Sequence, residues 1–326
     1  MTKTVINFRV DEEIKQQAKE VAKQLGVSLS TIINSQLRQL IRSRSVELNA
    51  DKDSGQFANL VTEISNSKPA KSRPQSVNTS SRRLWSGYTQ YSAAVVSFWD
   101  SLIDWQKRRE GEGDFYINNL RKHGVKTVLD FACGTGYDSI RLLEEGFKVT
   151  SSDGSTNNLV KAHINAEDAG VTLDASICDW RRLERHFNTQ FDAAICLGNS
   201  FCHLFEAEDR RDVLKQVAAL LPSGGVFIID QHNFDKILDK GFSSKHKYVY
   251  AGDAVDVRVA AKNDSYLKLI YSAKTAEYHL EIYPIRAKEL KTLLKEVGFE
   301  VTTYGDFNPK FSKYDPDFLQ HVCVKR

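Results

Sequence analysis

The segment VLDFACGTGYDS, residues 128–139, constrains the fold more than any other part of this sequence. A run with strand character ends in Asp130, the chain turns through two glycines, and a helical pattern follows. From about residue 115 onward strand and helix patterns alternate, as a parallel sheet requires. The expected strands are TVLDFA, KVTSSD, LDASICD, FDAAICLG and GVFIID. This order predicts an α/β fold, a doubly wound Rossmann-like sheet whose ligand lies at the carboxyl ends of the strands.

The surroundings of Gly134 and Gly136 narrow the choice of ligand. A phosphate-binding P-loop needs a lysine after its second glycine, and this segment has none. The dinucleotide fingerprint needs a third small residue, and Ser139 stands there. Asp153 ends the next strand, 17 residues after Gly136. An acid at this position accepts hydrogen bonds from both hydroxyls of a ribose. These features predict an adenosyl ligand and do not require a pyrophosphate.

The front of the chain has a different pattern. Residues 4–10, TVINFRV, alternate as a strand does. A first helix is expected from Asp11 to Gly26, and a second begins near Ser28 or Ser30. One short strand and two helices cannot bury their apolar faces alone, so this segment needs a partner.

Residues 3–45 resemble the ribbon-helix-helix fold of small repressors and antitoxins. In that family two chains pair their strands, and the outward side chains of the ribbon enter the major groove of DNA. The resemblance implies a module over residues 1–47 that makes the protein at least a homodimer, with Val5, Asn7 and Arg9 as the DNA contacts. Two interpretations stay open, a DNA-binding module and a dimerisation clip whose outer face touches nothing. The first 50 residues hold 8 basic and 5 acidic side chains, a modest excess for a DNA-binding module.

Charge and composition divide the chain into two parts. Residues 1–83 carry 14 basic and 8 acidic residues, whereas the remainder carries 31 and 34. Residues 48–83 are rich in Ser, Asn, Lys, Asp and Pro, which predicts a flexible basic linker. The expected organisation is therefore a small module, this linker and a body over residues 84–326.

The body resembles S-adenosylmethionine-dependent methyltransferases in VLDFACGTGYDSIRLLEEGFKVTSSD, DW and FDAAICLGNSFCHL. More narrowly, it is similar to glycine and glycine/sarcosine N-methyltransferases from about residue 86 to the end, and ICLGNSFCHL is a particular run. The resemblance implies S-adenosylmethionine as cofactor, with Asp153 at the ribose and Asp179 and Trp180 beside the adenine. The implied cofactor residues are Tyr88, Tyr91, Arg108 (or Arg109), Asp130, Ala132, Cys133, Gly134, Gly136, Asp153, Asp179, Trp180, Leu197 and His203.

Several of these residues also have a purely structural interpretation. Trp180 fits simple packing at a strand end, and His203 fits a hydrogen bond to a backbone carbonyl. Asp130 is expected either to orient the glycine turn or to touch the cofactor. Cys133 is expected to fill space and not to act as a nucleophile.

The resemblance also implies the residues that hold the methyl acceptor. These are Asn199 of LGNSF and three tyrosines, Tyr250, Tyr271 and Tyr283. The tyrosines lie in alternating segments that predict an antiparallel flap at about residues 240–285, over the strand ends, although each also fits an ordinary sheet aromatic. Methyl transfer from a sulfonium is an in-line displacement that depends on positioning and requires no dedicated strong base.

One position departs from the resembling family. Glycine-methylating relatives present an arginine after the fifth strand to hold the carboxylate of the amino acid, and here the stretch IIDQHNFDKI places His232 there. Arginine is permanently cationic and binds both carboxylate oxygens, and neutral histidine does neither. The sequence therefore predicts an amine substrate that lacks an α-carboxylate or holds it differently. Basic or guanidino-containing amines are candidates, because the body is mildly acidic.

The sequence thus predicts a small-molecule N-methyltransferase. The alternative from another class is a DNA-binding regulator whose methyltransferase-like body senses the cofactor without reacting. A nucleic-acid methyltransferase is disfavoured, because LGNSF replaces the [DNS]-P-P-[YFW] signature. Five cysteines without metal-ligand spacing predict no metal site and reduced, mostly buried thiols of a cytoplasmic protein. No apolar stretch approaches the ~18 residues of a membrane span.

Overall fold

The computed structural model describes residues 93–242, 255–273 and 276–326, together with isolated positions between residues 12 and 33. The predictions for the ribbon-helix-helix segment, including Val5, Asn7 and Arg9, lie outside the described residues, as do those for the linker. The same holds for Tyr88, Tyr91 and Tyr250.

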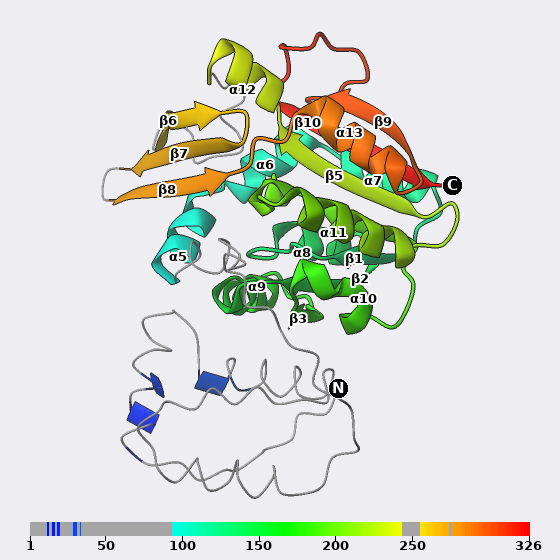
Figure 1. Ribbon diagram of the computed structural model, residues 1–326. Helices are drawn as coiled ribbons and strands as arrows, with labels where there is room; N and C mark the ends of the chain where they lie inside the picture. The colour runs from blue at the N-terminus through cyan, green and yellow to red at the C-terminus, as the bar shows by residue number, and fades with distance from the viewer. Residues whose placement is uncertain are drawn as a thin grey trace, which may run out of the picture.

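A seven-stranded sheet forms the centre of the body, with the order β3-β2-β1-β4-β5-β10-β9 (Figure 1). The strands are β1 (Thr127–Asp130), β2 (Lys148–Asp153), β3 (Ala175–Ile177), β4 (Ala193–Cys196), β5 (Val226–His232), β9 (Phe299–Gly305) and β10 (Phe318–Lys325). The first five are parallel, and β10 runs antiparallel to both β5 and β9. The predicted doubly wound sheet is confirmed, and its order reverses between β1 and β4, where such sheets bind ligands.

Helices cover both faces of the sheet, so the parallel strands are largely buried on both sides. The helices are α5 (Ala93–Leu102), α6 (Trp105–Glu112), α7 (Phe115–Lys122), α8 (Tyr137–Glu144), α9 (Thr156–Asp168), α10 (Leu183–His186), α11 (Ala207–Ala219), α12 (Phe234–Lys240) and α13 (Ala287–Glu296). Along β1, Val128 packs with α7 and α8, whereas Leu129 packs with the cluster that contains α11 and α13. This alternation follows from the two-residue period of a strand. Figure 1 shows α11 and α13 in front of the sheet.

A second, three-stranded antiparallel sheet stands beside the first, with the order β6-β7-β8 (Figure 1). Its strands are β6 (Val255–Asn263), β7 (Tyr266–Ala273) and β8 (Ala276–Ile282). This sheet is the predicted flap. Leu269 and Tyr271 of β7 join the main core, and the N–H of Tyr283 donates to the carbonyl oxygen of Cys202 at 2.8 Å. The flap is therefore packed onto the loop that follows β4.

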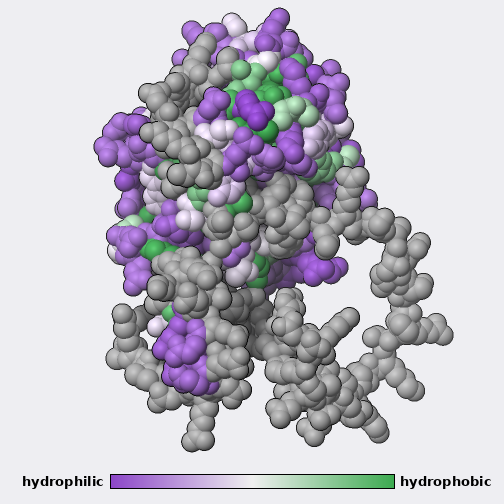
Figure 2. Space-filling view, turned by 90° about the vertical axis from the view of Figure 1, so that its left-hand side faces the viewer, coloured by the Kyte–Doolittle hydropathy of each residue, from purple (hydrophilic) through white to green (hydrophobic). Residues whose placement is uncertain are grey.

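The outer face of the flap is polar. Asp256, Arg258, Glu277 and His279 are exposed along β6 and β8. Figure 2, which views this side of the molecule, shows a described surface that is mostly hydrophilic. Among the described helices, none is long and apolar enough to cross a membrane.

All five cysteines lie in the described body. Each is buried, and none of them is in a disulfide. The expected burial of the thiols is confirmed.

Candidate active site

The glycine turn connects β1 to α8, and the backbone conformation of its two glycines explains their presence. Gly134 has φ +52° and Gly136 has φ +95°, which side-chain-bearing residues rarely adopt. A Cβ on Gly136 would also lie 3.1 Å from the Cβ of Ala162 on α9. Gly134 lines a cavity at the strand ends, whereas Gly136 lies behind it and permits close packing of the turn on α9.

Asp130 lies beneath this turn and outside the lining of the cavity. Its carboxylate accepts hydrogen bonds from the Ser139 hydroxyl at 2.6 Å and from the Ala132 N–H at 3.3 Å. Burial raises the pKa of Asp130 to about 7. Of the two roles considered from the sequence, this placement supports the one that orients the turn.

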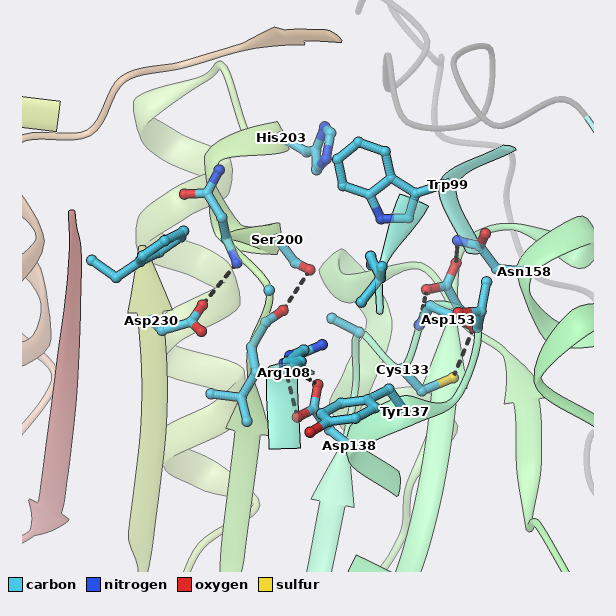
Figure 3. A pocket seen from close by; sticks show the side chains of 18 of the residues that line it. Trp99, Arg108, Cys133, Tyr137, Asp138, Asp153, Asn158, Ser200, His203 and Asp230 are labelled. Carbon is cyan, nitrogen blue, oxygen red and sulfur yellow. Dashed lines mark hydrogen bonds and ion pairs between the residues drawn. The ribbon is translucent and has the colours of Figure 1, made fainter. Parts of the chain in front are cut away.

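Asp153, at the end of β2, faces the cavity beside Gly134 (Figure 3). Its carboxylate accepts from the N–H groups of Gly134 at 2.9 Å and Ser155 at 2.8 Å, and from the Asn158 amide at 3.1 Å. Burial raises the pKa of Asp153, and these three donors oppose the shift. The glycine turn and the acid of the second strand are thus joined directly.

The cavity holds about 1320 Å³ of space between atoms, its open mouth included. It spans the carboxyl ends of β1, β2, β4 and β5 and the amino end of the antiparallel strand β10. Figure 3 shows Asp153 and Asp230 at opposite sides of it. Of the predicted cofactor residues, those that line it are Arg108, Ala132, Cys133, Gly134, Asp153, Trp180, Leu197 and His203. Asp179 does not line the cavity, because its carboxylate pairs with Arg181 at 2.6 Å. Adjacent residues thus face different ways, since Trp180 points inward.

Arg108 and Arg109 were alternatives for the cofactor carboxylate, and only Arg108 of the two lines the cavity. Its Nε donates to Glu112 at 2.6 Å, and its Nη2 donates to both oxygens of Asp138 at 3.0 and 3.1 Å. Arg109 instead pairs with Glu144 at 2.6 Å. Burial raises the pKa of Glu112, while Arg108 opposes the shift.

Asn199 lies on the β4 side of the cavity, in a left-handed backbone conformation with φ +62°. Its N–H donates to Asp230 Oδ1 at 2.7 Å, and its Oδ1 accepts from the N–H of His232 at 2.9 Å. Asp230 also accepts from the Tyr116 hydroxyl at 3.2 Å, and burial raises its pKa to about 6. These bonds fix the loop after β4 to the end of β5.

His232 ends β5 inside the cavity and is buried. Burial lowers the pKa of His232 to about 4, so the ring is neutral at pH 7. The imidazole stacks on the ring of Phe318 in the neighbouring strand, with centroids 4.4 Å apart.

The structure separates the remaining predicted tyrosines. Tyr271 lines the cavity and lies edge-on to Trp99 at 5.1 Å. Tyr283 does not line it, contrary to the expected position. Its hydroxyl donates to Glu289 at 3.1 Å, and its ring lies under the Arg210 guanidinium at 3.7 Å. Tyr283 follows the last residue of β8, where the side chain turns toward α11 and α13.

The sequence patterns point to fewer than half of the residues that line the cavity. The additional ones include Trp99, Glu112, Tyr116, Tyr137, Asp138, Asn158, Asp230, Phe307, Phe318 and Gln320. Asp230 stands at the end of the fifth expected strand, a position that could have marked it. Phe307, Phe318 and Gln320 come from β10 and its preceding loop, and no local pattern connects them to the other strand ends.

An adenosyl sulfonium fits these residues. The backbone of Gly134 is bare toward the cavity, an acid ends the second strand, and the Arg108 guanidinium lies on another wall (Figure 3). A cavity at the β1/β4 reversal with this arrangement defines the class, an S-adenosylmethionine-dependent methyltransferase.

Comparison with known proteins gives the family. The methyltransferase domain family matches residues 128–225. The chain is 47% identical over 238 residues to the glycine/sarcosine N-methyltransferase of Aphanothece halophytica, covering 72% of this chain and 90% of that one. It is 37% identical to the glycine N-methyltransferase of Oryctolagus cuniculus, over 78% of this chain and 97% of that one. The chain belongs to the glycine/sarcosine N-methyltransferase family and is an S-adenosylmethionine-dependent N-methyltransferase.

Two further comparisons concern the fold and the front of the chain. An S-adenosylmethionine-dependent methyltransferase from Clostridium acetobutylicum superposes with a TM-score of 0.57 at 18% identity, covering 71% of this chain and 98% of that one. This likeness shows the fold. The RelB antitoxin family matches residues 3–83, which confirms the resemblance of the front segment to antitoxins.

Proposed function

We propose that this N-methyltransferase acts on a small-molecule amine that is not glycine and is not held through an α-carboxylate. The observation that carries the proposal is the charge of the acceptor end, defined as Asn199, Asp230, His232, Phe318 and Gln320. Its acidic side chain is that of Asp230, and burial keeps His232 neutral. The sequence resemblance implies an arginine at the position of His232 in glycine-methylating enzymes. A carboxylate on the substrate would meet a like charge there and no cation.

The charges along the whole cavity also favour an amine without a carboxylate. Among the described residues that line it, Arg108 is the sole permanently cationic side chain, and Glu112 and Asp138 already engage it. Four carboxyl groups line the cavity, those of Glu112, Asp138, Asp153 and Asp230. Opposite charge at short range favours a protonated amine and disfavours a second anion.

The residues of the chain position and deprotonate the amine. When bound, S-adenosylmethionine supplies a methyl group on a positively charged sulfur. Asp230 is placed to pair with the arriving ammonium, and its raised pKa suits it to share the proton before displacement. Asn199 fixes Asp230 and His232 relative to each other, so the amine meets a preorganised surface. In the same proposal Tyr271 closes the flap side, while Asp153, Trp180 and His203 hold the cofactor.

The test is a panel of amines assayed for S-adenosylhomocysteine formation with the full chain and with His232→Arg. We expect the wild type to methylate glycine and sarcosine poorly and at least one amine without a carboxylate well. In His232→Arg, kcat/KM for glycine should rise by about ten-fold or more, because a charge-assisted pair to a carboxylate contributes roughly 1.5–3 kcal/mol. Efficient methylation of glycine by the wild type would refute the proposal.

For the front segment we propose a dimerisation module over residues 1–47, joined by residues 48–83 to the catalytic body over residues 84–326. The match to RelB antitoxins supports self-association and keeps DNA as a second partner. It also favours one alternative function, a DNA-binding regulator with a cofactor-sensing body. The buried free cysteines support a cytoplasmic location.

A further inference from the structure

We propose that Gln320 recognises a neutral hydrogen-bond acceptor on the amine substrate, of the carboxamide-carbonyl kind. This inference rests on the proposed function and names the substrate class of the same site. Its starting point is a buried residue whose side-chain amide lines the acceptor end of the cavity.

Gln320 lies on β10 directly opposite Asp230 of β5, and Phe318 lies opposite His232. The two pairs share one face of the sheet, because side chains alternate along each strand. Gln320 is 1% exposed and lines the cavity. A carboxylate and a carboxamide therefore stand side by side, with a stacked ring pair next to them.

The hydrogen bonding of Gln320 determines which way its amide points. Its Oε1 accepts from the N–H of Phe307 at 2.9 Å. A backbone N–H can only donate, so the bonded atom is oxygen and the other is the NH₂ group. Among the described residues, Nε2 has no hydrogen-bond partner. An amide donor without a protein partner, on a residue that lines a cavity, calls for an acceptor on the ligand.

The loop that presents Phe307 is held firmly. Asp306 and Phe307 have φ +46° and +66°, a conformation that is costly for residues other than glycine and that clusters at functional sites. The Asp306 carboxylate accepts from the N–H groups of Asp317 and Phe318, each at 3.0 Å. Phe307 packs against Phe115 at 5.3 Å. The Phe307 N–H that binds Oε1 of Gln320 is thus itself held in place.

The combination defines a ligand of particular chemistry. Asp230 suits an ammonium, the Gln320 N–H suits a neutral oxygen, and Phe307 and Phe318 supply apolar walls. A carboxylate could accept from Gln320, but it would stand beside Asp230 without a cation to offset the repulsion. A short amine that carries a carboxamide satisfies all of these groups.

The experiment uses three probes of similar size, glycinamide, glycine and n-propylamine, with the full chain and S-adenosylmethionine. The values of kcat/KM are corrected for the fraction of free amine. The variants are Gln320→Leu, which removes the donor, and Gln320→Glu, which removes the donor but keeps an oxygen for Phe307 N–H. Gln231→Leu is the matched control. Gln231 is also a buried glutamine, but it lies next to Asp230 on β5 and does not line the cavity. Calorimetry of S-adenosylmethionine binding is run on every variant.

We expect the wild type to prefer glycinamide over n-propylamine, and both Gln320 variants to reduce that ratio by about ten-fold, the value of one hydrogen bond. Gln231→Leu should keep the ratio, and cofactor affinity should stay unchanged throughout. A ratio insensitive to both Gln320 variants, or no turnover of glycinamide by a protein that binds S-adenosylmethionine, overturns the inference. A wild type that prefers glycine overturns the proposed function instead, so the two failures are distinct.

Discussion

Two buried aspartates, Asp130 and Asp230, have different tasks although burial raises the pKa of both. Asp130 is bonded to Ser139 and to the N–H of Ala132 beneath the glycine turn, and its pKa is about 7. Asp230 faces the cavity, and its pKa is about 6. Both carboxyl groups therefore titrate near neutral pH. Asp130 does so beneath the glycine turn, and Asp230 does so in the cavity.

The raised pKa of Asp130 makes stability depend on pH. Between about pH 4 and about pH 7 the folded state binds a proton that the unfolded state has lost, so this residue makes stability fall as pH rises through that window. Asp130→Asn removes the titration. The free energy of unfolding of the variant minus that of the wild type should increase by on the order of a few kcal/mol as pH rises from about 4 to about 7. Above about pH 7 this difference should stay constant. Thermal melts at several pH values measure this difference. A difference independent of pH would contradict the expected protonation.

At the scale of elements, the connection between β9 and β10 is the part of the fold that builds the acceptor end. Lys236 of α12 forms a buried ion pair with Asp317 at 2.6 Å, and the Asn233 amide donates to the Pro316 carbonyl at 3.0 Å. These contacts tie the connection to the end of β5. The position of Phe318 beside His232 therefore depends on α12 as well as on strand pairing.

Breaking this ion pair should affect the two ends of the cavity unequally. In Lys236→Met the Asp317 carboxylate stays buried without its cation, which costs about 3–5 kcal/mol of stability. We expect the KM of the acceptor amine to rise more than the dissociation constant of S-adenosylmethionine, because the connection borders only the acceptor end. Chemical denaturation and steady-state kinetics measure the two effects. The control is Lys236→Met with Asp317→Leu, which removes the lone charge and should regain part of the stability. An equal loss of cofactor affinity would contradict this assignment.

The sequence allowed the parallel half of this fold to be predicted better than the antiparallel half. Strands β1 to β5 are short, mostly buried runs, each followed by a turn or helix signal, and the sequence predicts all five. The cofactor side follows these strands closely, so Gly134 and Asp153 could be located from spacing alone. Both residues are within a few positions of a strand end.

The acceptor side could not be predicted in the same way, because long-range pairing creates it. Gln320 reaches Asp230 only through the antiparallel return of β10 along β5, 90 residues later in the chain. The position of Phe307 depends on a left-handed backbone conformation, which a phenylalanine in the sequence does not predict. Tyr283 was misplaced for a related reason, since an alternating pattern gives the faces of a strand but not the residue that follows its end.

At the scale of the whole molecule, the chain joins a body of known family to a segment that matches antitoxins. The body contains the described cavity, and its lining draws on residues from Trp99 to Gln320. The RelB match ends at residue 83, before the first described helix of the body. We therefore expect the segment and the catalytic site to be separable by substitution.

Replacing Asn7 and Arg9 together with alanine in the full chain tests this separation. If the segment binds DNA as ribbon-helix-helix proteins do, the double variant should lose retention of the protein's own promoter fragment in a gel-shift assay, because both outward polar contacts are gone. Methyl-group turnover should be unchanged. Reduced turnover in the variant would show that the two parts are coupled, and a shift that survives would exclude the ribbon face as the contact.

The burial of every cysteine has a consequence for how the enzyme tolerates its surroundings. Burial raises the pKa of Cys133, Cys196, Cys202 and Cys323, and it raises that of Cys178 to about 12. The thiolate is the form that peroxides and alkylating agents attack, and its population at neutral pH is then negligible. Even Cys133, which borders the cofactor side of the cavity, is held in its unreactive form. Methyl transfer by this protein should therefore continue under oxidative conditions that inactivate enzymes with reactive cysteines.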